Sequence, residues 1–398
     1  MEHKYQLIFI GQDFGIEEKI IEKFYEKLNE LGVEKKHLKI INSQNFIDYS
    51  DRNPAFCVYM GHEPVQESAS KNPTYKDEKI AELLIHDATL ILPVIEGHLD
   101  SFNQFIPECL RPFNGMTAYD GVETAVAKIV SNILEGFSLL RKSRRIFISY
   151  KRNESTGVAI QLYERLGAHG FDVFLDTHSI QKNEPFQDEL WHRMTDSDVV
   201  VLLSTSNFLQ SEWSKEELAR ASSLSLGIVQ FVWPNAHLVG EAQICLPIKL
   251  NNHDFVNEVF LSKDAKLENA IVELAVSEIE SIRARTLAAR QDNLTSEFIK
   301  YANIYGVKAI LDSHKFITLH KGDKEIIVIP TIGIPQSFTC NQSQELVREI
   351  KKKDFDEIYL LYDQIHIRDY WLSHLNWLNQ YLPVRTKELQ KVKAWLNS

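Results

Sequence analysis

Residues 144–233 read RRIFISYKRNESTGVAIQLYERLGAHGFDVFLDTHSIQKNEPFQDELWHRMTDSDVVVLLSTSNFLQSEWSKEELARASSLSLGIVQFVW. Two apolar runs in this stretch, Ile146–Ser149 and Val199–Leu203, are each followed by a polar loop and then by a segment with helical periodicity. Such alternation predicts a parallel α/β sheet. Open sheets of this kind bind ligands at the carboxyl ends of their strands. Polar residues gather just after the predicted strands, at Ser149–Asn153, Asp176–Phe186, Ser204–Ser206 and Ser211–Glu217.

The same stretch resembles a Toll/interleukin-1 receptor (TIR) domain of the bacterial kind. The matching pieces, in order, are FISY at Phe147–Tyr150, FDVFLDTHSI at Phe171–Ile180, SDVVVLLST at Ser197–Thr205 and SEWSKEEL at Ser211–Leu218. Each piece alone is a weak signal, whereas four in this order and spacing are specific. The resemblance covers about a quarter of the chain. It implies a central TIR sheet of the flavodoxin-like parallel type in an α/β protein.

The composition of the whole chain is that of an ordinary globular protein. The 398 residues predict two or three domains, and a net charge of −11 argues against general nucleic-acid binding or binding to an anionic membrane. Apolar runs are too short to span a bilayer, and the first residues lack the pattern of a signal peptide. We therefore expect a cytoplasmic protein. Its four cysteines have no paired spacing, which predicts reduced thiols and no metal site.

Four parts are expected along the chain. Residues 1–135 are predicted to form a degenerate TIR-like or flavodoxin-like α/β domain, and residues 144–260 the TIR domain. Residues 263–294 are predicted to form a long linking helix, because apolar residues recur at helical spacing within Lys266–Arg290. That helix packs across a neighbouring domain or pairs with another subunit. Residues 295–398 are expected to form a carboxyl-terminal α/β domain for sensing or assembly.

The first part resembles the second in layout. LIFIGQDFG parallels IFISYKRNE, and HLKIINSQNF parallels FDVFLDTHSI. The stretch containing Thr89–Val94 parallels the one containing Val199–Leu203, which leaves Tyr49–Asp77 as an insertion. In this alignment Pro107–Glu108–Cys109 is the counterpart of Glu216–Glu217–Leu218, so Glu108 corresponds to Glu217. We favour dimerisation or recognition over a second active site for this first copy.

The resemblance to TIR domains implies cleavage of NAD⁺ between nicotinamide and ribose. A carboxylate assists this reaction by offsetting the positive charge that develops on the ribose. Glu217 stands where the family keeps that carboxylate, in the pattern Trp213-x-x-x-Glu217-Leu218, and one helical turn brings Trp213 and Glu217 to one side. Glu216 is the adjacent alternative carboxylate. Ser214 replaces a cysteine that is frequent in the family. We expect Glu217 to be catalytic.

Other candidate substrate-binding residues follow the predicted strands. The basic pair in the loop after the first strand would meet a pyrophosphate or form an exposed basic loop. Trp191 would stack on a ring of the substrate or belong to the core, and core is the commoner outcome. The chain lacks the glycine patterns of Rossmann dehydrogenases and P-loop ATPases, so NAD⁺ is expected as substrate and no cofactor is expected. The predicted substrate-binding set is Ser149, Tyr150, Lys151, Arg152, Asp176, Trp191, Ser204 and Trp213.

The loop at Asp176–Phe186 corresponds to the family's BB loop, which often docks onto a neighbouring TIR domain. Lys182–Asn183 stands here in place of the family's Pro-Gly, and asparagine tolerates the left-handed backbone of such a turn. Imidazole titrates near neutral pH, which makes His178 and His192 candidates for acid–base work, but neither has metal-like spacing. Solvated or capping roles are therefore more usual for them.

Three functions remain open from the sequence. The preferred one is a TIR-domain NAD⁺ glycohydrolase that releases nicotinamide and ADP-ribose or a cyclic ADP-ribose isomer. It would be a bacterial anti-phage defence effector, activated by self-association through TIR domains in response to a phage-derived or protein trigger. The alternative is a non-enzymatic TIR adaptor, which commonly lacks the carboxylate. A third reading makes the carboxyl-terminal domain a nucleotide-processing enzyme that uses Asp363, His366 and Arg368.

Overall fold

The computed structural model forms two compact units, Met1–Leu140 with Asp312–Lys315, and Arg141–Leu311 with Phe316–Ser398. Each unit is described by itself. The residues described are 5–30, 33–51, 53–62, 73–87, 89–119, 121–137, 139, 143–177, 192–208, 226–236, 246–312, 314–351, 355–363 and 367–397.

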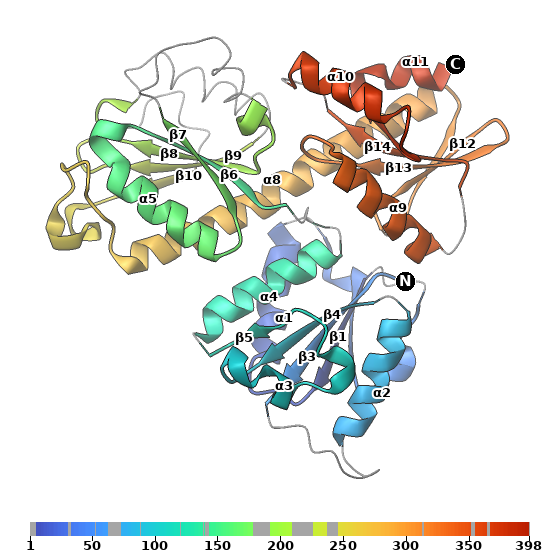
Figure 1. Cartoon of the computed structure of the whole chain (residues 1–398), viewed down its shortest axis with the longest axis horizontal. Coiled ribbons are helices and arrows are strands. Elements are labelled where there is room, and N and C mark those ends of the chain that lie inside the picture. Colours follow the sequence, from blue (N-terminus) through green and yellow to red (C-terminus); the bar gives the residue numbers. More distant parts are fainter. Residues whose placement is uncertain are drawn as a thin grey trace. The chain divides into compact units, whose positions relative to one another are not determined.

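The first unit contains a five-stranded parallel sheet in the order β2-β1-β3-β4-β5 (Figure 1). Nearly every residue of β1, β3 and β4 is buried, which explains why these strands read as continuous apolar runs. Helices α1 and α4 pack against one another, and α2 packs on the sheet. The elements are β1 Tyr5–Gly11, α1 Glu17–Glu30, β2 Leu38–Asn42, β3 Ala55–Gly61, α2 Pro73–His86, β4 Leu90–Ile95, α3 Phe102–Phe105, β5 Met116–Thr117 and α4 Val122–Gly136.

The structure corrects the alignment between the two halves. The predicted insertion Tyr49–Asp77 contains β3, which lies at the centre of the sheet between β1 and β4. The strand predicted at Thr89–Val94 is therefore the fourth in the chain rather than the third. Glu108 follows that fourth strand, so it is not the positional counterpart of a residue that follows the third strand.

The second unit begins with a parallel sheet in the order β10-β9-β8-β6-β7. If strands are numbered from the first in each sheet, both sheets have the order 2-1-3-4-5, which is that of flavodoxin-like folds. The predicted α/β class with a central flavodoxin-like parallel sheet is confirmed. The elements are β6 Arg145–Tyr150, α5 Arg152–Ala168, β7 Asp172–Thr177, β8 Val199–Ser204, β9 Gly227–Val232 and β10 Leu246–Lys249.

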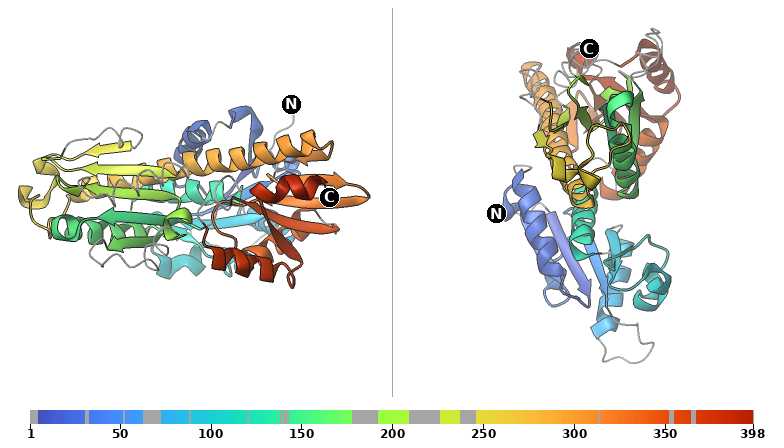
Figure 2. Two further views of the ribbon diagram at one scale, coloured as in Figure 1. Left: turned by 90° about the horizontal axis from the view of Figure 1, so that it is seen from above. Right: turned by 90° about the vertical axis from the view of Figure 1, so that its left-hand side faces the viewer.

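Helix α8, Asn269–Ile304, is continuous over 36 residues, which corresponds to about 54 Å. Its first part packs beside α5 and shares the core of the second sheet through Val276 and Ile279. Its last part belongs to another core through Leu294 and Phe298. Figure 2 shows the helix as one unbroken rod along both sheets of the second unit. The helix thus begins later and ends later than the predicted 263–294.

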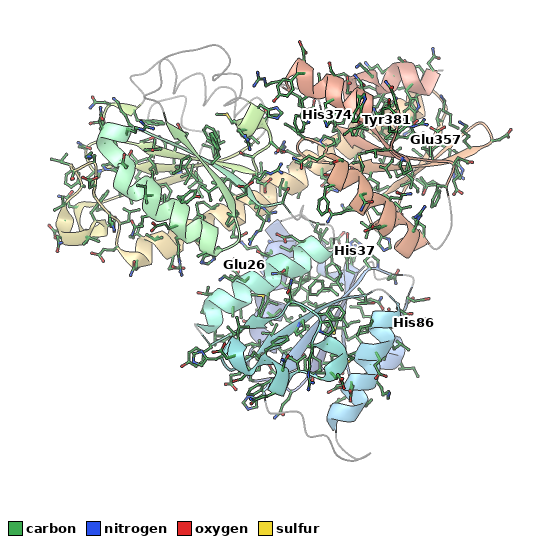
Figure 3. All side chains as sticks on the ribbon, in the orientation of Figure 1. Glu26, His37, His86, Glu357, His374 and Tyr381 are labelled. Atoms are coloured by element: carbon green, nitrogen blue, oxygen red, sulfur yellow. The ribbon has the colours of Figure 1, made fainter. Side chains whose placement is uncertain are left out.

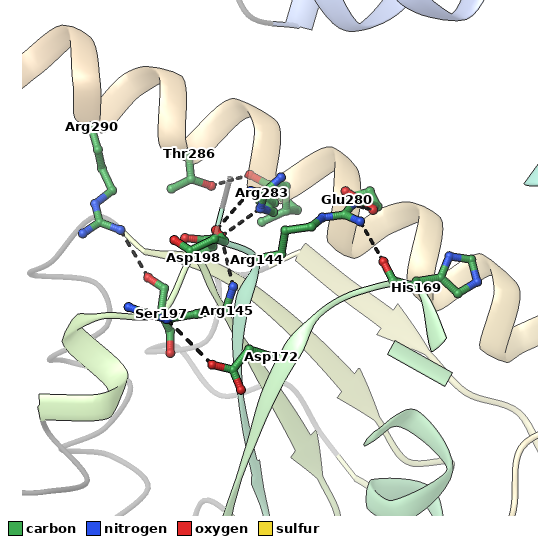
Figure 4. A network of polar contacts seen from close by, with 12 residues as sticks. Arg144, Arg145, His169, Asp172, Ser197, Asp198, Glu280, Arg283, Thr286 and Arg290 are labelled. Carbon is green, nitrogen blue, oxygen red and sulfur yellow. Dashed lines mark hydrogen bonds and ion pairs between the residues drawn. The ribbon is translucent and has the colours of Figure 1, made fainter. Parts of the chain in front are cut away.

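A polar network fixes α8 to the amino ends of β6 and β8 (Figure 4). Arg283 forms a fully buried ion pair with Asp198, and Arg144 is paired with Glu280. Arg290 donates to the carbonyl of Ser197 over 3.3 Å. The middle of the helix is therefore attached to the sheet by charge pairs and not only by apolar packing.

The third sheet completes the second unit and has the order β11-β12-β13-β14-β15. The first three strands pair antiparallel, and the last three pair parallel. Residues of α8 and α11 cover one core of this sheet, and α10 belongs to another. The elements are β11 Lys308–Leu311, β12 Ile317–Lys321, β13 Lys324–Pro330, α9 Ser337–Lys351, β14 Glu357–Tyr362, α10 Asp369–Leu378, β15 Val384–Glu388 and α11 Val392–Asn397.

Single-turn 3₁₀ helices connect several of these elements, at Lys35–His37, Phe46–Asp48, Leu99–Ser101, Glu108–Leu110, Asn252–Asp254, Val256–Glu258 and Leu389–Lys391. Within the described ranges, no helix combines the length and the apolar character needed to cross a membrane.

Candidate functional site

The carboxyl edge of the second sheet has the geometry of a ligand site. Strand β6 lies between β7 and β8, so the chain leaves β6 toward one side and returns to its other side. Loops that leave neighbouring strands in opposite directions create a crevice at the carboxyl ends, where open α/β sheets bind ligands. The loops after β6 and β8 border this switch point.

The loop after β6 is short and shaped by its own hydrogen bonds. Lys151 is the N-terminal cap of α5, and the helix is kinked at Ser155, whose φ and ψ are −145° and 25°. The Ser155 hydroxyl lies 3.3 Å from both the backbone nitrogen and the carbonyl oxygen of Lys151. Because Ser155 is buried, its hydroxyl stabilises this turn from the core side and keeps Lys151 at the edge of the sheet.

Lys151 joins the loops that follow β6 and β8. Its Nζ donates to the carbonyl oxygen of Asn207 over 3.2 Å and lies 3.2 Å from Oε1 of Glu154. The Asn207 amide in turn donates to Glu154 over 3.1 Å. The side chain of Lys151 is 37% exposed at the rim of the crevice.

The pKa of Glu154 lies below the ordinary value of 4.5. Burial alone would raise it, but hydrogen bonds from neighbouring side chains, Asn207 and Lys151 among them, outweigh that effect. Glu154 is therefore ionised at neutral pH. The cluster presents a fixed carboxylate and a fixed ammonium group side by side.

Deeper residues of this edge are buried. Ser204, at the end of β8, accepts a hydrogen bond from the Gln230 amide over 2.9 Å, and both residues are buried. Ser149 is fully buried at the end of β6, whereas Tyr150 packs in the hydrophobic core of the sheet. Ser149, Lys151 and Ser204 thus meet at one edge, and the Tyr150 ring lies apart from them. The part of these residues in substrate binding stays a prediction.

The remaining predicted site residues divide into two groups. Arg152 is exposed in the first turn of α5, and the backbone of Asp176 pairs with Ser149 in the parallel register of β6 and β7. Outside the described residues lie the predicted catalytic Glu217, the adjacent Glu216, Trp213, Ser214, Trp191, His178 and most of the BB-loop stretch, including Lys182–Asn183.

Sequence reasoning missed Glu154, Asn207 and Gln230. Glu154 is three residues after Lys151 in the first turn of a helix, a spacing that usually indicates an exposed ion pair. Gln230 is the one polar residue in the otherwise apolar strand GIVQFV, and a buried amide requires a partner. A polar residue within an apolar strand could therefore have identified Gln230 from the sequence.

Histidines and metal ligands do not contribute to the described part of this edge. His192 is 7% exposed and packs against Trp371, with 5.4 Å between ring centroids, at the amino edge of the sheet. It is therefore neither solvated nor near the carboxyl edge. No group of three or more possible metal ligands is found among the described residues.

The equivalent edge of the first sheet has its own polar centre. Asp77, which is 5% exposed, accepts a hydrogen bond from the backbone nitrogen of Gly11 over 3.2 Å and one from the Ser43 hydroxyl. Burial raises the pKa of Asp77 above 3.8, although these hydrogen bonds partly offset the effect. Gly11 has a φ of +89°, and a Cβ there would lie 2.2 Å from the Met60 carbonyl oxygen, so only glycine fits. Glu108 is exposed in a 3₁₀ helix.

Asp363, His366 and Arg368 are the candidate residues for a nucleotide-processing site in the carboxyl-terminal domain. Asp363 accepts a hydrogen bond from the Gln390 amide over 2.6 Å. The Arg368 guanidinium lies over the Tyr370 ring, 4.7 Å from its centroid. His366 lies outside the described residues.

Comparison with solved structures gives only remote similarity. A PLP-bound putative aminotransferase from Clostridium difficile 630 is 12% identical over 50% of this chain and 61% of that chain, with a TM-score of 0.21. A putative aminotransferase from Burkholderia pseudomallei K96243 is 11% identical over 50% of this chain and 66% of that chain, with a TM-score of 0.20. The chain thus spans less than two thirds of these two proteins. Tagatose-6-phosphate ketose/aldose isomerase from Escherichia coli is 13% identical over 72% of this chain and 81% of that chain, with a TM-score of 0.20.

Comparison with protein families is specific. Residues 146–237 match the model of the TIR domain. The matched range starts in β6, includes β8 and β9, and therefore contains the switch point with Lys151, Glu154, Ser204 and Asn207. The chain carries a TIR domain at its centre, built on the second parallel sheet.

Proposed function

We propose that the TIR domain is an NAD⁺ glycohydrolase, with Glu217 as the carboxylate that acts on the ribose. The products are nicotinamide and ADP-ribose or a cyclic ADP-ribose isomer. The observation that supports this proposal is the polar cluster at the switch point, where Lys151 connects the loops after β6 and β8. The sequence adds Glu217 in its Trp213-x-x-x-Glu217-Leu218 setting, within the range matched by the family model.

The chemistry requires charge stabilisation rather than a redox group. The nicotinamide ring of NAD⁺ is cationic and departs as a neutral molecule, so positive charge moves to the ribose. A carboxylate next to the ribose stabilises that charge in the transition state, and this type of electrostatic effect is usually a large part of catalysis. Water, or the adenine of the same molecule, then attacks the ribose carbon. The two attacks give the linear and the cyclic product.

The described residues supply binding groups for the rest of the dinucleotide. The partly exposed Lys151 side chain and the exposed Arg152 stand at the start of α5, where the helix dipole also favours an anion. A pyrophosphate at this point would be held by two cations. Glu154 and Asn207 hold Lys151 in position for it.

The biological role follows from the same resemblance. We propose a cytoplasmic bacterial defence effector whose TIR domains assemble after a phage-derived or protein trigger. The first unit and the third sheet would sense that trigger or control assembly. A non-enzymatic TIR adaptor is the competing function.

The test is incubation of the purified chain with NAD⁺ at several protein concentrations, with chromatographic separation of nicotinamide, ADP-ribose and cyclic ADP-ribose isomers. We expect nicotinamide release that rises more steeply than linearly with protein concentration, because assembly completes the site. Co-release of ADP-ribose or of a cyclic isomer names the reaction. Protein self-association without nicotinamide release at any concentration would favour the adaptor.

A further inference from the structure

A cavity of about 300 Å³ lies at the amino edge of the TIR sheet, within the second unit. The starts of β6 and β7 and residues 192–197 form one wall, and residues 334–336 with α10 form the other. Ser149 and Ser204 mark the opposite, carboxyl edge. Four residue steps along β6, from Arg145 to Ser149, separate the two edges, or about 13 Å. The cavity is thus distinct from the switch-point site.

Three aromatic side chains contribute to the cavity lining. Phe174 from β7 and Tyr370 and Trp371 from α10 line it. The planes of Tyr370 and Trp371 are nearly perpendicular, at 83°, with centroids 6.2 Å apart. The Arg193 guanidinium lies 5.9 Å from the centroid of Phe174. Such an arrangement offers ring faces and edges to a flat ligand.

The charges of the lining balance. Arg145 forms an ion pair with Asp196, and its Nε lies 3.8 Å from Asp172. Asp196 also accepts a hydrogen bond from the backbone nitrogen of Ile334 over 3.0 Å, which joins the two walls. With Arg193, the lining holds two arginines and two aspartates. A neutral ligand with both donors and acceptors fits this lining better than an ion does.

Trp371 lines the cavity through its ring. Its Nε1 is buried, with no acceptor among the residues with described positions, so this N–H is not open to a ligand in the cavity. The Gln336 side chain, which also lines the cavity, can both donate and accept.

We propose that this cavity binds a neutral, planar nitrogen heterocycle that packs against the Trp371 ring and forms hydrogen bonds with Gln336. Its volume is at the lower end of the range for small-molecule sites, which suits a nucleobase, a nucleoside or nicotinamide. A bound ligand would bridge the TIR sheet and α10 and stabilise their contact. The proposal is independent of NAD⁺ cleavage, because binding is measured directly.

The chain offers a matched control for Trp371. Trp377 lies six residues after Trp371 on α10. It is 52% exposed and does not line the cavity. It stacks on His374 with 5.9 Å between centroids and lies 5.0 Å from Tyr381. His374 and Tyr381 are labelled in Figure 3. Substitution of Trp377 removes the same ring from the same element outside the cavity.

The experiment is isothermal titration calorimetry of the full chain with adenosine and, separately, with nicotinamide. We expect saturable binding of at least one of them, and the comparison identifies whether a nucleoside or the free pyridine is preferred. Trp371→Leu loses the aromatic ring, and its Kd should rise about ten- to one-hundred-fold. Trp377→Leu should bind as the wild type does.

Gln336→Ala provides a test that does not disturb the core, since Gln336 is only half-buried. It should weaken binding about two- to ten-fold. The proposal is overturned if neither adenosine nor nicotinamide binds at millimolar concentration. It is equally overturned if binding is unchanged in both Trp371→Leu and Gln336→Ala, because the ligand would then occupy another site.

Discussion

Arg283 in the middle of α8 donates from Nε to Oδ2 of Asp198 over 2.8 Å, and both side chains are completely buried. Asp198 precedes β8 and also lies 3.3 Å from the backbone nitrogen of Arg145. The pair therefore connects the long helix to the two central strands of the TIR sheet. Asp198 and the switch-point residues are at opposite ends of β8, so the pair supports the sheet and takes no direct part in the candidate site.

Substitution of Arg283 by methionine should strongly destabilise the second unit. Methionine fills much of the volume but leaves Asp198 buried without its cation, which costs about 3–5 kcal/mol of unfolding free energy. All six tryptophans lie in the second unit, so urea unfolding followed by tryptophan fluorescence reports on it alone. Arg285→Met is the control, because Arg285 is exposed on the same helix. Equal losses in the two variants would show that the ion pair is dispensable.

Gly227 provides a second test of the helix position. A Cβ on this residue would lie 2.3 Å from Cγ2 of Ile282 and 2.8 Å from Oγ1 of Thr286 in α8. Gly227→Ala should therefore cost about 1–3 kcal/mol through overpacking. Gly167→Ala is the matched control, since no atom lies within 4 Å of the added carbon and alanine favours the helix. A Gly227→Ala variant as stable as Gly167→Ala would place α8 further from β9 than the structure has it.

Asp77 predicts a pH effect in the first unit. Its pKa is raised in the folded state, mainly by burial. The folded state thus holds this proton more tightly than the unfolded chain does. Below the unfolded pKa, near 3.8, Asp77 does not lower the free energy of unfolding. As pH rises from there through the folded pKa, Asp77 lowers the free energy of unfolding progressively. Asp77→Asn removes this dependence.

Hydrogen exchange with mass spectrometry can follow β1 and α2 in wild type and Asp77→Asn. Comparison at the same pH cancels the intrinsic pH dependence of exchange. Between about pH 4 and pH 7, the protection of the variant relative to wild type should increase. A relative protection that does not change with pH, or that falls, would contradict the assigned environment of Asp77.

Much of the fold could be predicted because strands of parallel sheets are apolar on both faces. Leu7–Ile10 and Val199–Leu203 are examples, and both lie in central strands. The strand Ala55–Gly61 has the same character but was assigned to an insertion, because the alignment of the two halves took precedence over the local pattern. Local composition was the better guide there.

The full length of α8 could not be predicted from one apolar stripe. Val276 and Ile279 face the core of the second sheet, whereas Leu294 and Phe298 face the core of the third. The buried face therefore changes along the helix, and its periodicity is blurred. The Arg283–Asp198 pair was equally hidden, because it joins residues 85 positions apart that become neighbours only after folding.

At the candidate site, the sequence predicted polar residues at the carboxyl edge of the sheet but not the contact between the two loops. Lys151 and Ser204 were expected at the carboxyl ends, and they lie there. The role of Glu154 was not expected, because its interaction with Asn207 depends on the approach of two loops. Glu217 and Trp213 lie outside the described residues, so their role rests on the motif.

The role proposed for Glu217 in NAD⁺ cleavage is tested most directly by comparing nicotinamide release by wild type, Glu217→Gln and Glu216→Gln. The two variants lose the same charge at adjacent positions, so they differ only in which carboxylate remains. We predict that Glu217→Gln lowers the rate about 10²- to 10³-fold or more, while Glu216→Gln stays close to wild type. Release by Glu217→Gln at the wild-type rate would contradict the account, as would loss of activity in Glu216→Gln alone.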